Sequence, residues 1–506
     1  MRRLLPMFPV LAVSAALHVS AASASSTQIS IMTAASAGSA TAELSTLRAL
    51  GVTEVRVPLS WASVAPAGKQ PSNPSSPNSY PASAWAQYDA FDTAAAADRI
   101  TVDFDIGNPS PRWAQAGGAP GYLKNSGNWK PNAAEFGSFV KAVATRYNGH
   151  NGLPRVSNWS IWNEPNYGPS LAPQASEGGR VVVAATYYRN LVDAADSAFK
   201  ATGHGGDTIT FGETAPHGYA NGGIDSGTAP LIFLRALYCV GSNYRPLTGS
   251  LASASGCPTT ARASRSFRSK NPLLFTAKGF AAHLYAQGQA PNKTLASRSP
   301  CARIDTADSA DLANAGKLAS TLDSANRAYG SHSHLNIYNT EYGFQTDPPE
   351  TPACNVRPVS QDTAAVYDNW GEYLSWKNSR IASFDQYLLV DPQGGNFASG
   401  LIFADGTQKA GYDAFQVPLF MPTTSVRSAS TLEVWGGARS SHFGGASNVL
   451  LQFQPNGGSW STVATPGLSH GYFDTHVRFT QSGSLRVVWV ENGTNYLSRT
   501  QTITVG

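Results

Sequence analysis

The chain has 506 residues, with 36 Lys and Arg against 32 Asp and Glu and a formal net charge of +4. Only 13% of the residues are charged and 42% are hydrophobic, which excludes a charge-rich disordered protein and allows a large buried core. The length suits one large barrel with a small additional module. Because the basic residues form no stripe, we expect no nucleic-acid partner.

The first 25 residues have the pattern of a secretory signal peptide. Arg2 and Arg3 precede an apolar run at 4–16, and small residues follow at 20–25. This order of charge, apolar stretch and small residues is typical of exported proteins. The run is too short to span a bilayer comfortably, although an N-terminal membrane anchor is the alternative. We therefore expect a secreted protein with no membrane contact after cleavage.

Four cysteines follow this leader: Cys239, Cys257, Cys301 and Cys354. An even number of cysteines in an exported protein indicates two disulfides, for which three pairings exist. We predict Cys239–Cys257 and Cys301–Cys354, because each of these bonds closes one local loop. The sequence has no C-x-x-C motif, which argues against a zinc or redox site.

Residues 26–416 alternate between strand and helix patterns. Short β-branched runs predict eight strands, at 28–33, 53–58, 100–106, 157–163, 208–213, 278–285, 335–341 and 381–390. Amphipathic stretches predict helices at 42–50, 133–147, 181–200, 307–329 and 361–377. Eight such units predict an α/β protein with a (β/α)8 TIM barrel. A doubly wound sheet is the structural rival, but the sequence has neither G-x-G-x-x-G nor a P-loop.

The sequence changes character from 421 to 506, where Ser, Gly and Thr separate short alternating apolar runs. These runs predict strands at 431–435, 448–454, 476–479, 484–490 and 500–505. Short strands at this spacing are typical of an antiparallel β-sandwich. We expect the domain to serve as a packing or spacer module. Carbohydrate binding through Trp435, Trp460 or Trp489 is the alternative.

Two glutamates close predicted strands of the barrel. Glu164 lies in Trp162-Asn163-Glu164-Pro165-Asn166 after the fourth strand, and Glu341 ends the seventh in Asn339-Thr340-Glu341. Barrel enzymes carry their chemistry at the C-terminal ends of the strands. Two facing carboxylates are what retaining glycoside hydrolysis needs, at a separation of about 5–5.5 Å, whereas about 6.5–9.5 Å suits inversion. A loop carboxylate or helix cap is the alternative for Glu164.

These motifs resemble the paired signatures of clan A retaining glycoside hydrolases, with families 5 and 39 the most similar. The resemblance covers roughly residues 28–416 and includes the 177 residues that separate Glu164 from Glu341. It implies that Glu164 is the acid/base, that Glu341 is the nucleophile, and that Asn163 binds the 2-hydroxyl of the sugar. It also implies a secreted enzyme that cleaves O-glycosidic bonds in a plant or microbial oligo- or polysaccharide without a cofactor.

The resemblance also suggests residues around the nucleophile. Arg56, in the second strand, stands where the clan keeps an arginine, and a cation there would hold Glu341 ionised with a low pKa; a surface arginine is the alternative. His283 and Tyr285 end the sixth strand, and we expect one of them to touch Glu341. Glu213 ends the fifth strand, where it would bind sugar hydroxyls or compete with Glu341 as nucleophile.

Other candidates for sugar contact follow from position alone. Asp103 and Asp105 lie on the third strand. The register of that strand decides whether their side chains point into the barrel, where they could contact a sugar. Aromatic residues in predicted βα loops, Trp61, Trp113, Tyr167 and Phe344, are candidate stacking platforms. The clan commonly has a tryptophan at the end of the eighth strand, and here Gln386 or Tyr387 takes that place. The identity of the sugar therefore stays open.

Two other functions share these residues. A transglycosylase would pass the sugar to another sugar instead of to water, and a non-catalytic carbohydrate-binding protein would use the barrel only as a scaffold. We expect no catalytic metal, because Asp305, Asp308 and Asp311 fit the start of a helix. A serine nucleophile is also unexpected, since the sequence has no G-x-S-x-G motif. The anomer, endo or exo action and the oligomeric state are not predicted.

Overall fold

The computed structural model describes residues 27–506 except 67, 297–303, 354–355 and 428–429. The expected signal peptide and the expected Cys301–Cys354 disulfide therefore lie outside the described residues. The Cys239–Cys257 disulfide is present, with an S–S distance of 2.01 Å. Within the described part of the chain, none of the helices combines the length and the apolar character needed to cross a membrane.

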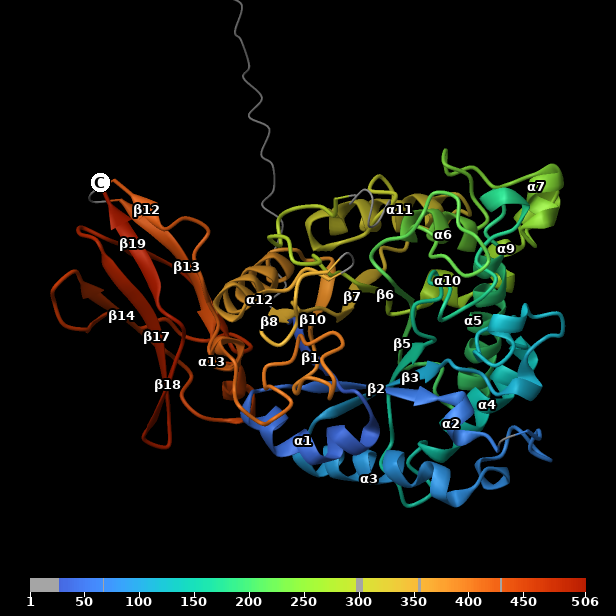
Figure 1. The fold of residues 1–506 in the computed structure, drawn as a ribbon, viewed down its shortest axis with the longest axis horizontal. Helices are drawn as coiled ribbons and strands as arrows, with labels where there is room; N and C mark the ends of the chain where they lie inside the picture. The colour runs from blue at the N-terminus through green and yellow to red at the C-terminus, as the bar shows by residue number, and fades with distance from the viewer. Residues whose placement is uncertain (1–26, 67, 297–303, 354–355, 428–429) are drawn as a thin grey trace, which may run out of the picture.

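Eight parallel strands close into a barrel in the order β1-β10-β7-β6-β5-β4-β3-β2 (Figure 1). They are β1 Ile29–Thr33, β2 Glu54–Ser60, β3 Thr101–Gly107, β4 Asn158–Ile161, β5 Thr208–Thr214, β6 Gly279–His283, β7 Asn336–Glu341 and β10 Ile381–Tyr387. Because β1 pairs with both β10 and β2, the sheet has no open edge. The predicted (β/α)8 barrel is confirmed, and the doubly wound alternative is excluded.

Side-chain alternation along the strands gives the barrel a polar interior. On β2, Val55 and Val57 join the large apolar core, whereas Arg56 reaches charged groups on other strands. On β3, Phe104 packs against aromatic rings of the helix layer while Asp105 pairs with Arg56. A period of two separates the two faces of a strand. The apolar core therefore lies between strands and helices, and the charges gather inside the ring.

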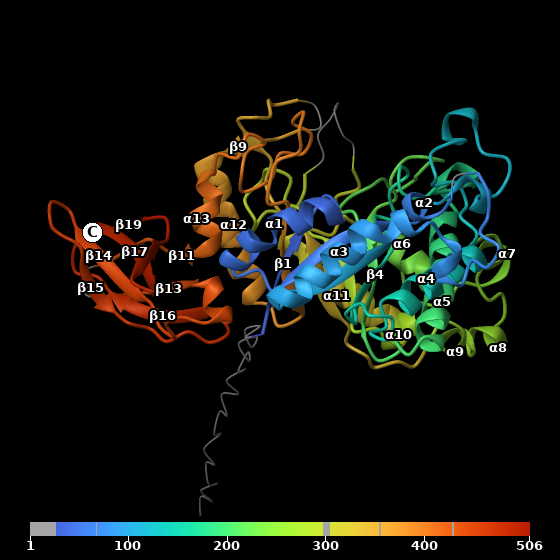
Figure 2. The same cartoon turned by 90° about the horizontal axis from the view of Figure 1, so that it is seen from below.

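Helices form the outer layer of the barrel (Figure 2). The principal ones are α1 Ala37–Ala49, α3 Ala82–Asp98, α4 Ala133–Arg146, α5 Val183–Ala201, α6 Pro230–Leu237, α11 Ala315–Arg327 and α12 Gln361–Trp376. The loop from α6 to β6 carries four short helices, α7 Gly249–Ala254, α8 Ala261–Ser264, α9 Phe267–Lys270 and α10 Leu273–Thr276. Helices were expected at the positions of α1, α4, α5, α11 and α12, and all five are present.

Helix α11 begins eight residues later than the pattern predicts, and the three aspartates before it do not share a helix face. Asp308 pairs with Arg235 at 2.8 Å. The Asp311 side chain instead accepts a hydrogen bond from the Asn314 amide and caps the 3-10 turn Leu312–Asn314. An N-cap of this kind marks where a helical segment begins, so the 3-10 turn starts after Asp311 and α11 continues from it at Ala315.

The C-terminal residues form two packed sheets, as predicted for a β-sandwich. One sheet joins β11 Leu419–Phe420, β13 Thr431–Gly437 and β16 Tyr472–Arg478. The other joins β12 Ser425–Val426, β14 Leu450–Pro455, β15 Ser461–Ala464, β17 Gly483–Glu491, β18 Thr494–Leu497 and β19 Gln501–Val505. Trp435 and Trp489 are fully buried, so the alternative in which these two rings bind sugar is wrong. The Arg486 guanidinium lies over the Trp460 ring, with 4.2 Å between its Cζ atom and the ring centroid.

The sandwich is fastened to the barrel by Arg439, which lies in the turn after β13. Its Nη2 lies 2.5 Å from Oε1 of Glu372 on α12, its Nη1 donates to the Ser30 hydroxyl at 2.8 Å, and its Nε donates to the Phe415 carbonyl at 2.6 Å. A Cβ added to Gly51 would lie 2.2 Å from the Arg439 carbonyl carbon. Glycine is therefore required there, and the two domains are in close backbone contact.

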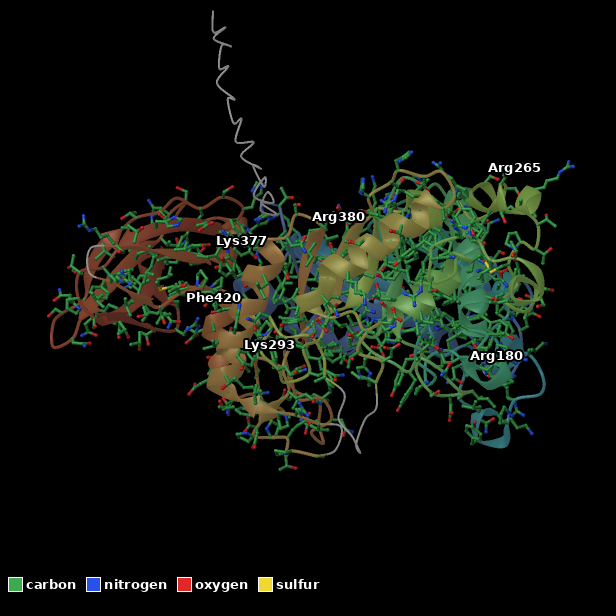
Figure 3. The ribbon with its side chains drawn as sticks, turned by 90° about the horizontal axis from the view of Figure 1, so that it is seen from above. Arg180, Arg265, Lys293, Lys377, Arg380 and Phe420 are labelled. Carbon is green, nitrogen blue, oxygen red and sulfur yellow. A yellow bond between two sulfur atoms is a disulfide. The ribbon has the colours of Figure 1, made fainter. Side chains whose placement is uncertain are left out.

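Aromatic packing and surface ion pairs extend this junction. Phe420 stacks on Trp370 of α12 with a centroid distance of 5.5 Å. At the end of α12, Lys377 lies 2.8 Å from both Glu433 and Asp474 of the sandwich. Lys377 and Phe420 mark the junction in Figure 3.

We expect Arg439→Met to destabilise the whole protein by about 3–5 kcal/mol, because it leaves the Glu372 carboxylate buried without its cation. Lys377→Met is the matched control, since Lys377 is 35% exposed and an exposed ion pair contributes at most about 1 kcal/mol. Urea unfolding at neutral pH measures both free energies. A small and equal loss in the two variants would show that Arg439 does not hold the domains together.

Candidate active site

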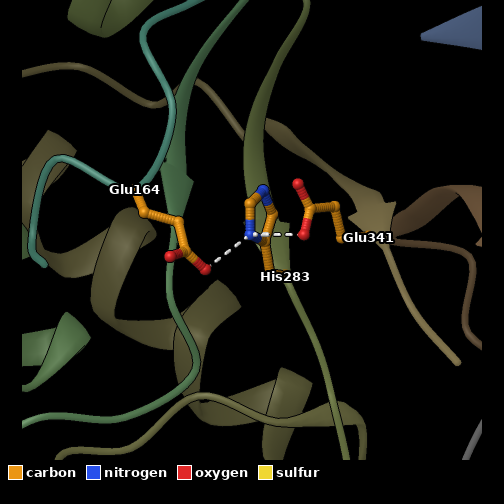
Figure 4. Close-up of side chains that lie close together, drawn as sticks. All are labelled: Glu164, His283 and Glu341. Carbon is orange, nitrogen blue, oxygen red and sulfur yellow. Dashed lines mark hydrogen bonds and ion pairs between the residues drawn. The ribbon is translucent and has the colours of Figure 1, made fainter. Parts of the chain in front are cut away.

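Glu164 and Glu341 face each other across the C-terminal mouth of the barrel (Figure 4). Glu341 is the last residue of β7, and Glu164 follows β4 by three residues. One oxygen of each carboxylate and one ring nitrogen of His283 all lie within 4.8 Å of one another. The nearest oxygens of the two carboxylates are therefore no more than 4.8 Å apart.

The backbone that carries Glu164 is in a conformation that side chains rarely adopt. Glu164 has φ +44° and Trp162 has φ +64°, both in the left-handed region that costs non-glycine residues energy. The Glu164 amide donates to the Glu213 carbonyl at 2.9 Å, and the buried Trp162 indole donates to the Ser170 carbonyl at 3.1 Å. These contacts from neighbouring segments hold the strained turn and direct Glu164 toward the barrel axis.

Arg56 connects most of the charged groups at the base of this site. Its Nη1 lies 3.0 Å from Oε1 of Glu341. Its Nη2 lies 2.9 Å from Oδ2 of Asp105, 2.9 Å from the side-chain oxygen Oδ1 of Asn163 and 3.1 Å from Oε2 of Glu213. The side chain is 2% exposed, so the alternative of a surface arginine is excluded. The planar guanidinium fixes these partners in direction as well as in distance.

His283 is the second buried cation of the site. Its Nδ1 lies 2.9 Å from Oε1 of Glu164 and 3.3 Å from Oε2 of Glu341, and its Nε2 lies 3.1 Å from Oε2 of Glu213. Burial lowers the pKa of His283, but Glu341, Glu164 and Glu213 raise it to about 10. At neutral pH both ring nitrogens therefore carry a proton, and Nδ1–H lies between the two facing carboxylates.

Glu341 has partners on both of its oxygens. Oε1 accepts from Arg56, and Oε2 accepts from the Tyr285 hydroxyl at 3.0 Å and faces His283. Both strand-six residues therefore touch Glu341, where only one was expected. Burial raises the pKa of Glu341 above its usual value, although His283 and Arg56 oppose the rise. The low pKa expected for this residue is not found, because removal from water outweighs the two cations.

Glu213 lies beneath the two facing glutamates and has no exposed surface. One of its oxygens contacts Arg56, His283 and the Thr340 hydroxyl, the last at 2.7 Å. Burial raises the pKa of Glu213, but Arg56 and His283 lower it to about 2. Both expected roles, sugar binding and competition as nucleophile, require an accessible carboxylate, which Glu213 does not present. Glu213 holds the two cations in place.

Two other expected contacts with sugar are fully buried. Trp61 is fully buried and stacks on Phe139 with a centroid distance of 5.7 Å, so it belongs to the core between strands and helices. Gln386 is also fully buried, and its amide donates to the Ser399 carbonyl at 2.7 Å, where it supports the loop after β10. The next residue, Tyr387, lies beside Tyr285 instead, with 6.3 Å between the ring centroids.

The strand-three aspartates and Phe344 are also buried, and Trp113 is half-buried. Asp105 binds Arg56, and Asp103 accepts from the Ser160 hydroxyl at 2.9 Å. Each aspartate is 4% exposed, so neither reaches the mouth. Phe344 is 2% exposed, and Trp113 packs edge-on against Trp61. Of the four predicted platforms, only Tyr167 is exposed, at 42%.

Three residues of the site were not among the site residues predicted from the sequence. Thr340 binds Glu213, and Asp385 accepts from the Thr33 hydroxyl at 3.2 Å. Phe397, in the loop after β10, packs against Tyr285 and Tyr387 at 5.2 and 5.4 Å between centroids. The alternation of inward residues on β10 is a signal for Asp385, whereas a loop residue such as Phe397 leaves no periodic signal.

Among the described residues, Glu164, His283 and Glu341 form the group whose spacing would accommodate a metal ion. The charges do not favour one. Nδ1 of His283 carries a proton directed at the carboxylates, and a metal ligand must be deprotonated. Arg56 already supplies a positive charge to Glu341.

No protein-family model and no curated protein sequence matches the chain. Its structure is similar to a family 39 glycoside hydrolase from Bacteroides cellulosilyticus WH2, with 13% identity, 90% of this chain and 82% of that one covered and a TM-score of 0.46. A family 30 endoxylanase from Clostridium papyrosolvens C71 has 10% identity, coverage of 91% and 95% and a TM-score of 0.42.

A family 1 β-glucosidase from Thermotoga maritima has 15% identity, coverage of 75% and 85% and a TM-score of 0.46. Families 39, 30 and 1 belong to clan A, the clan that the sequence motifs resemble. These TM-scores are below 0.5, and the fold itself is established by the strand pairing of the barrel.

We expect His283 to remain doubly protonated at neutral pH and to titrate near pH 10. Glu213→Gln should shift this titration to lower pH, because it removes a carboxylate that stabilises the imidazolium. Nitrogen-15 NMR of the ring, which distinguishes neutral from charged imidazole, measures both values without a substrate. A neutral His283 at pH 7, or an unchanged titration in Glu213→Gln, would contradict the charge assignment.

Proposed function

We propose that the protein is a secreted retaining glycoside hydrolase that acts on an oligo- or polysaccharide. The observation that supports this function is the close pair Glu164 and Glu341, which share the Nδ1–H of His283 at 2.9 and 3.3 Å. Export is supported by the pattern of residues 1–25 and by the Cys239–Cys257 disulfide, which is typical of oxidising compartments.

In the first step, an oxygen of Glu341 attacks the anomeric carbon of the sugar. The bond from that carbon to the glycosidic oxygen breaks, and the oxygen takes a proton from Glu164 and leaves as an alcohol. Arg56 and Tyr285 each hold one oxygen of Glu341, which orients the carboxylate. The side-chain oxygen of Asn163 accepts from Arg56, and its side-chain amide nitrogen supplies the contact to the 2-hydroxyl.

In the second step, Glu164 takes a proton from water, whose oxygen attacks the anomeric carbon and releases Glu341. Nδ1 of His283 lies 2.9 Å from Oε1 of Glu164 and so orients this carboxylate for both steps.

We expect wild-type protein to release sugar from at least one member of a panel of aryl glycosides and soluble polysaccharides, and Glu341→Gln to release none. Proton NMR of the first product should show retention of the anomeric configuration. Inversion, or turnover by Glu341→Gln, would refute the mechanism. If added acceptor sugars capture most of the product, the protein is a transglycosylase that uses the same residues.

Glu164→Ala should reduce turnover of natural linkages by about 10²–10⁴-fold, since it removes the proton donor. Aryl glycosides with a strongly acidic phenol need no proton to leave, so their first step should be nearly unaffected. The rate of the initial burst of phenol measures that step. Equal losses for both kinds of substrate would argue against acid catalysis by Glu164.

We expect kcat/KM to fall on the acid side with a midpoint above pH 4.5, because burial raises the pKa of Glu341 above that usual value. The nucleophile must be ionised, so activity is lost as pH decreases through this pKa. His283→Asn should move the midpoint to higher pH, since His283 lowers the pKa of Glu341. His334→Asn, at a 63% exposed histidine, is the control and should leave the profile unchanged.

A further inference from the structure

Aromatic side chains are exposed around the mouth of the barrel. Tyr122, Tyr167, Tyr219 and Phe397 are 66%, 42%, 42% and 38% exposed. They lie in the loops that follow β3, β4, β5 and β10, and so at the end of the barrel that carries Glu164 and Glu341. Isolated exposed aromatic residues need no explanation, but four around one opening indicate a binding surface.

Tyr167 and Tyr219 belong to the side of Glu164. The Tyr167 amide donates to the Glu164 carbonyl at 2.8 Å, so Tyr167 and Glu164 belong to the same turn of the chain. The Tyr219 amide donates to the Gly227 carbonyl at 2.9 Å. A Cβ on Gly227 would lie 3.5 Å from the Tyr167 ring. One short segment at Gly227 therefore connects the two tyrosines.

The buried side chain of Asn166 makes this frame rigid. Its amide group donates to the Thr228 carbonyl at 2.9 Å and to the Ala215 carbonyl at 3.2 Å, and its oxygen accepts from the Ala215 amide at 2.8 Å. The loops after β4 and β5 are thus bound to each other beside Glu164. The tyrosines are exposed on a fixed support, which reduces the entropy lost when a ligand binds.

A groove of about 740 Å³ is lined by residues of the same two loops and by Trp129 of the loop after β3. Its described lining consists of Trp129, Pro173, Ala175, Ser176, Gly178, Gly179, Asn221, Gly222, Gly223, Ile224 and Ser226. The wall begins next to Glu164, because the Gln174 amide donates to the Pro165 carbonyl at 2.9 Å. None of these described lining residues has a charged side chain, so the groove suits a neutral ligand with hydroxyl groups.

We propose that Tyr167, Tyr219 and this groove bind the leaving-group part of the substrate, and that this part is a neutral sugar chain. The proposal rests on the retaining glycosidase function proposed above, in which Glu164 protonates the leaving oxygen. The side of Glu164 is therefore the side on which the leaving group lies. Sugar rings present C–H faces that pack on tyrosine rings, and their hydroxyls suit Ser and Asn side chains.

This assignment restricts the substrate class. A glycoside with a small alkyl or aryl leaving group would leave the groove empty, whereas an oligosaccharide with two or more sugars beyond the cleaved bond would fill it. We therefore expect kcat/KM to increase with the number of sugars on the leaving side. The enzyme is then a hydrolase of oligo- or polysaccharides and not of small glycosides.

The test compares two substrates of the sugar identified in the panel, its glycosyl fluoride and a series of its unmodified oligosaccharides. Fluoride is a leaving group that occupies no subsite. Tyr167→Ala and Tyr219→Ala should each lower kcat/KM for the longer oligosaccharides by about tenfold, the size of one aromatic contact. Hydrolysis of the fluoride should change less than about twofold, and Tyr167→Phe should restore the oligosaccharide rate, because it keeps the ring.

Leu251→Ala is the matched control, since Leu251 is 44% exposed on α7 and should affect neither substrate. Equal losses on fluoride and oligosaccharides, or no loss on either, would overturn the proposal while the glycosidase function stands. Wild-type protein that cleaves the fluoride but no oligosaccharide would overturn it too.

If no substrate is cleaved, the proposed glycosidase function is wrong. The sugar-binding role of Tyr167 can then still be tested by measuring binding alone. Titration of Glu341→Gln protein with xylo-, cello- and manno-oligosaccharides, followed by intrinsic fluorescence, should show saturation that Tyr167→Ala weakens about tenfold. No saturation, or saturation that the substitution leaves unchanged, would overturn the subsite as well.

Discussion

The site depends on two cations, Arg56 and His283, placed among buried carboxylates. Isolated buried charges are costly, and a carboxylate at this depth would ordinarily take up a proton. Arg56 and His283 meet at Glu213, whose pKa they lower to about 2. Both cations contact Glu213 and also reach the mouth. There Arg56 contacts Glu341, and His283 contacts both Glu164 and Glu341.

The carboxyl groups farther from the two cations behave differently. Burial raises the pKa of Asp103 to about 7 and that of Glu54 to about 8. Part of the barrel interior is therefore protonated at neutral pH, whereas Glu213 stays ionised. Because these other groups can be neutral, the positive charge of Arg56 and His283 acts mainly on Glu213 and on the two glutamates at the mouth.

The sequence allowed the barrel, the sandwich and the two facing glutamates to be predicted, because each rests on a local pattern. Strand alternation is read directly from residues such as Val55, Arg56 and Val57, and the position of Glu341 follows from the end of its strand. Depth within the barrel is not a local property. Glu213 and Glu341 both end strands, but only the three-dimensional packing shows that Glu213 has no exposed surface.

The other errors fall at the C-terminal ends of strands. Trp61 follows β2 directly, and nothing in its neighbours indicates that its ring turns back against Phe139 on α4. Gln386 and Tyr387 are adjacent, so a shift of one residue in register exchanges their faces. Tyr387 proved to be the one beside Tyr285. Such choices depend on packing between segments that are distant in sequence.

The two glutamates differ in how the fold supports them, and this difference fits the two roles proposed for them. Glu341 ends a central strand and is held by Arg56, Tyr285 and His283, which suits a nucleophile that must attack along one direction. Glu164 lies beyond its strand on a turn with positive φ, held by the loops after β4 and β5. An acid/base must meet the leaving group in one step and water in the next. A position among the loops that form the outer groove places Glu164 where both can reach it.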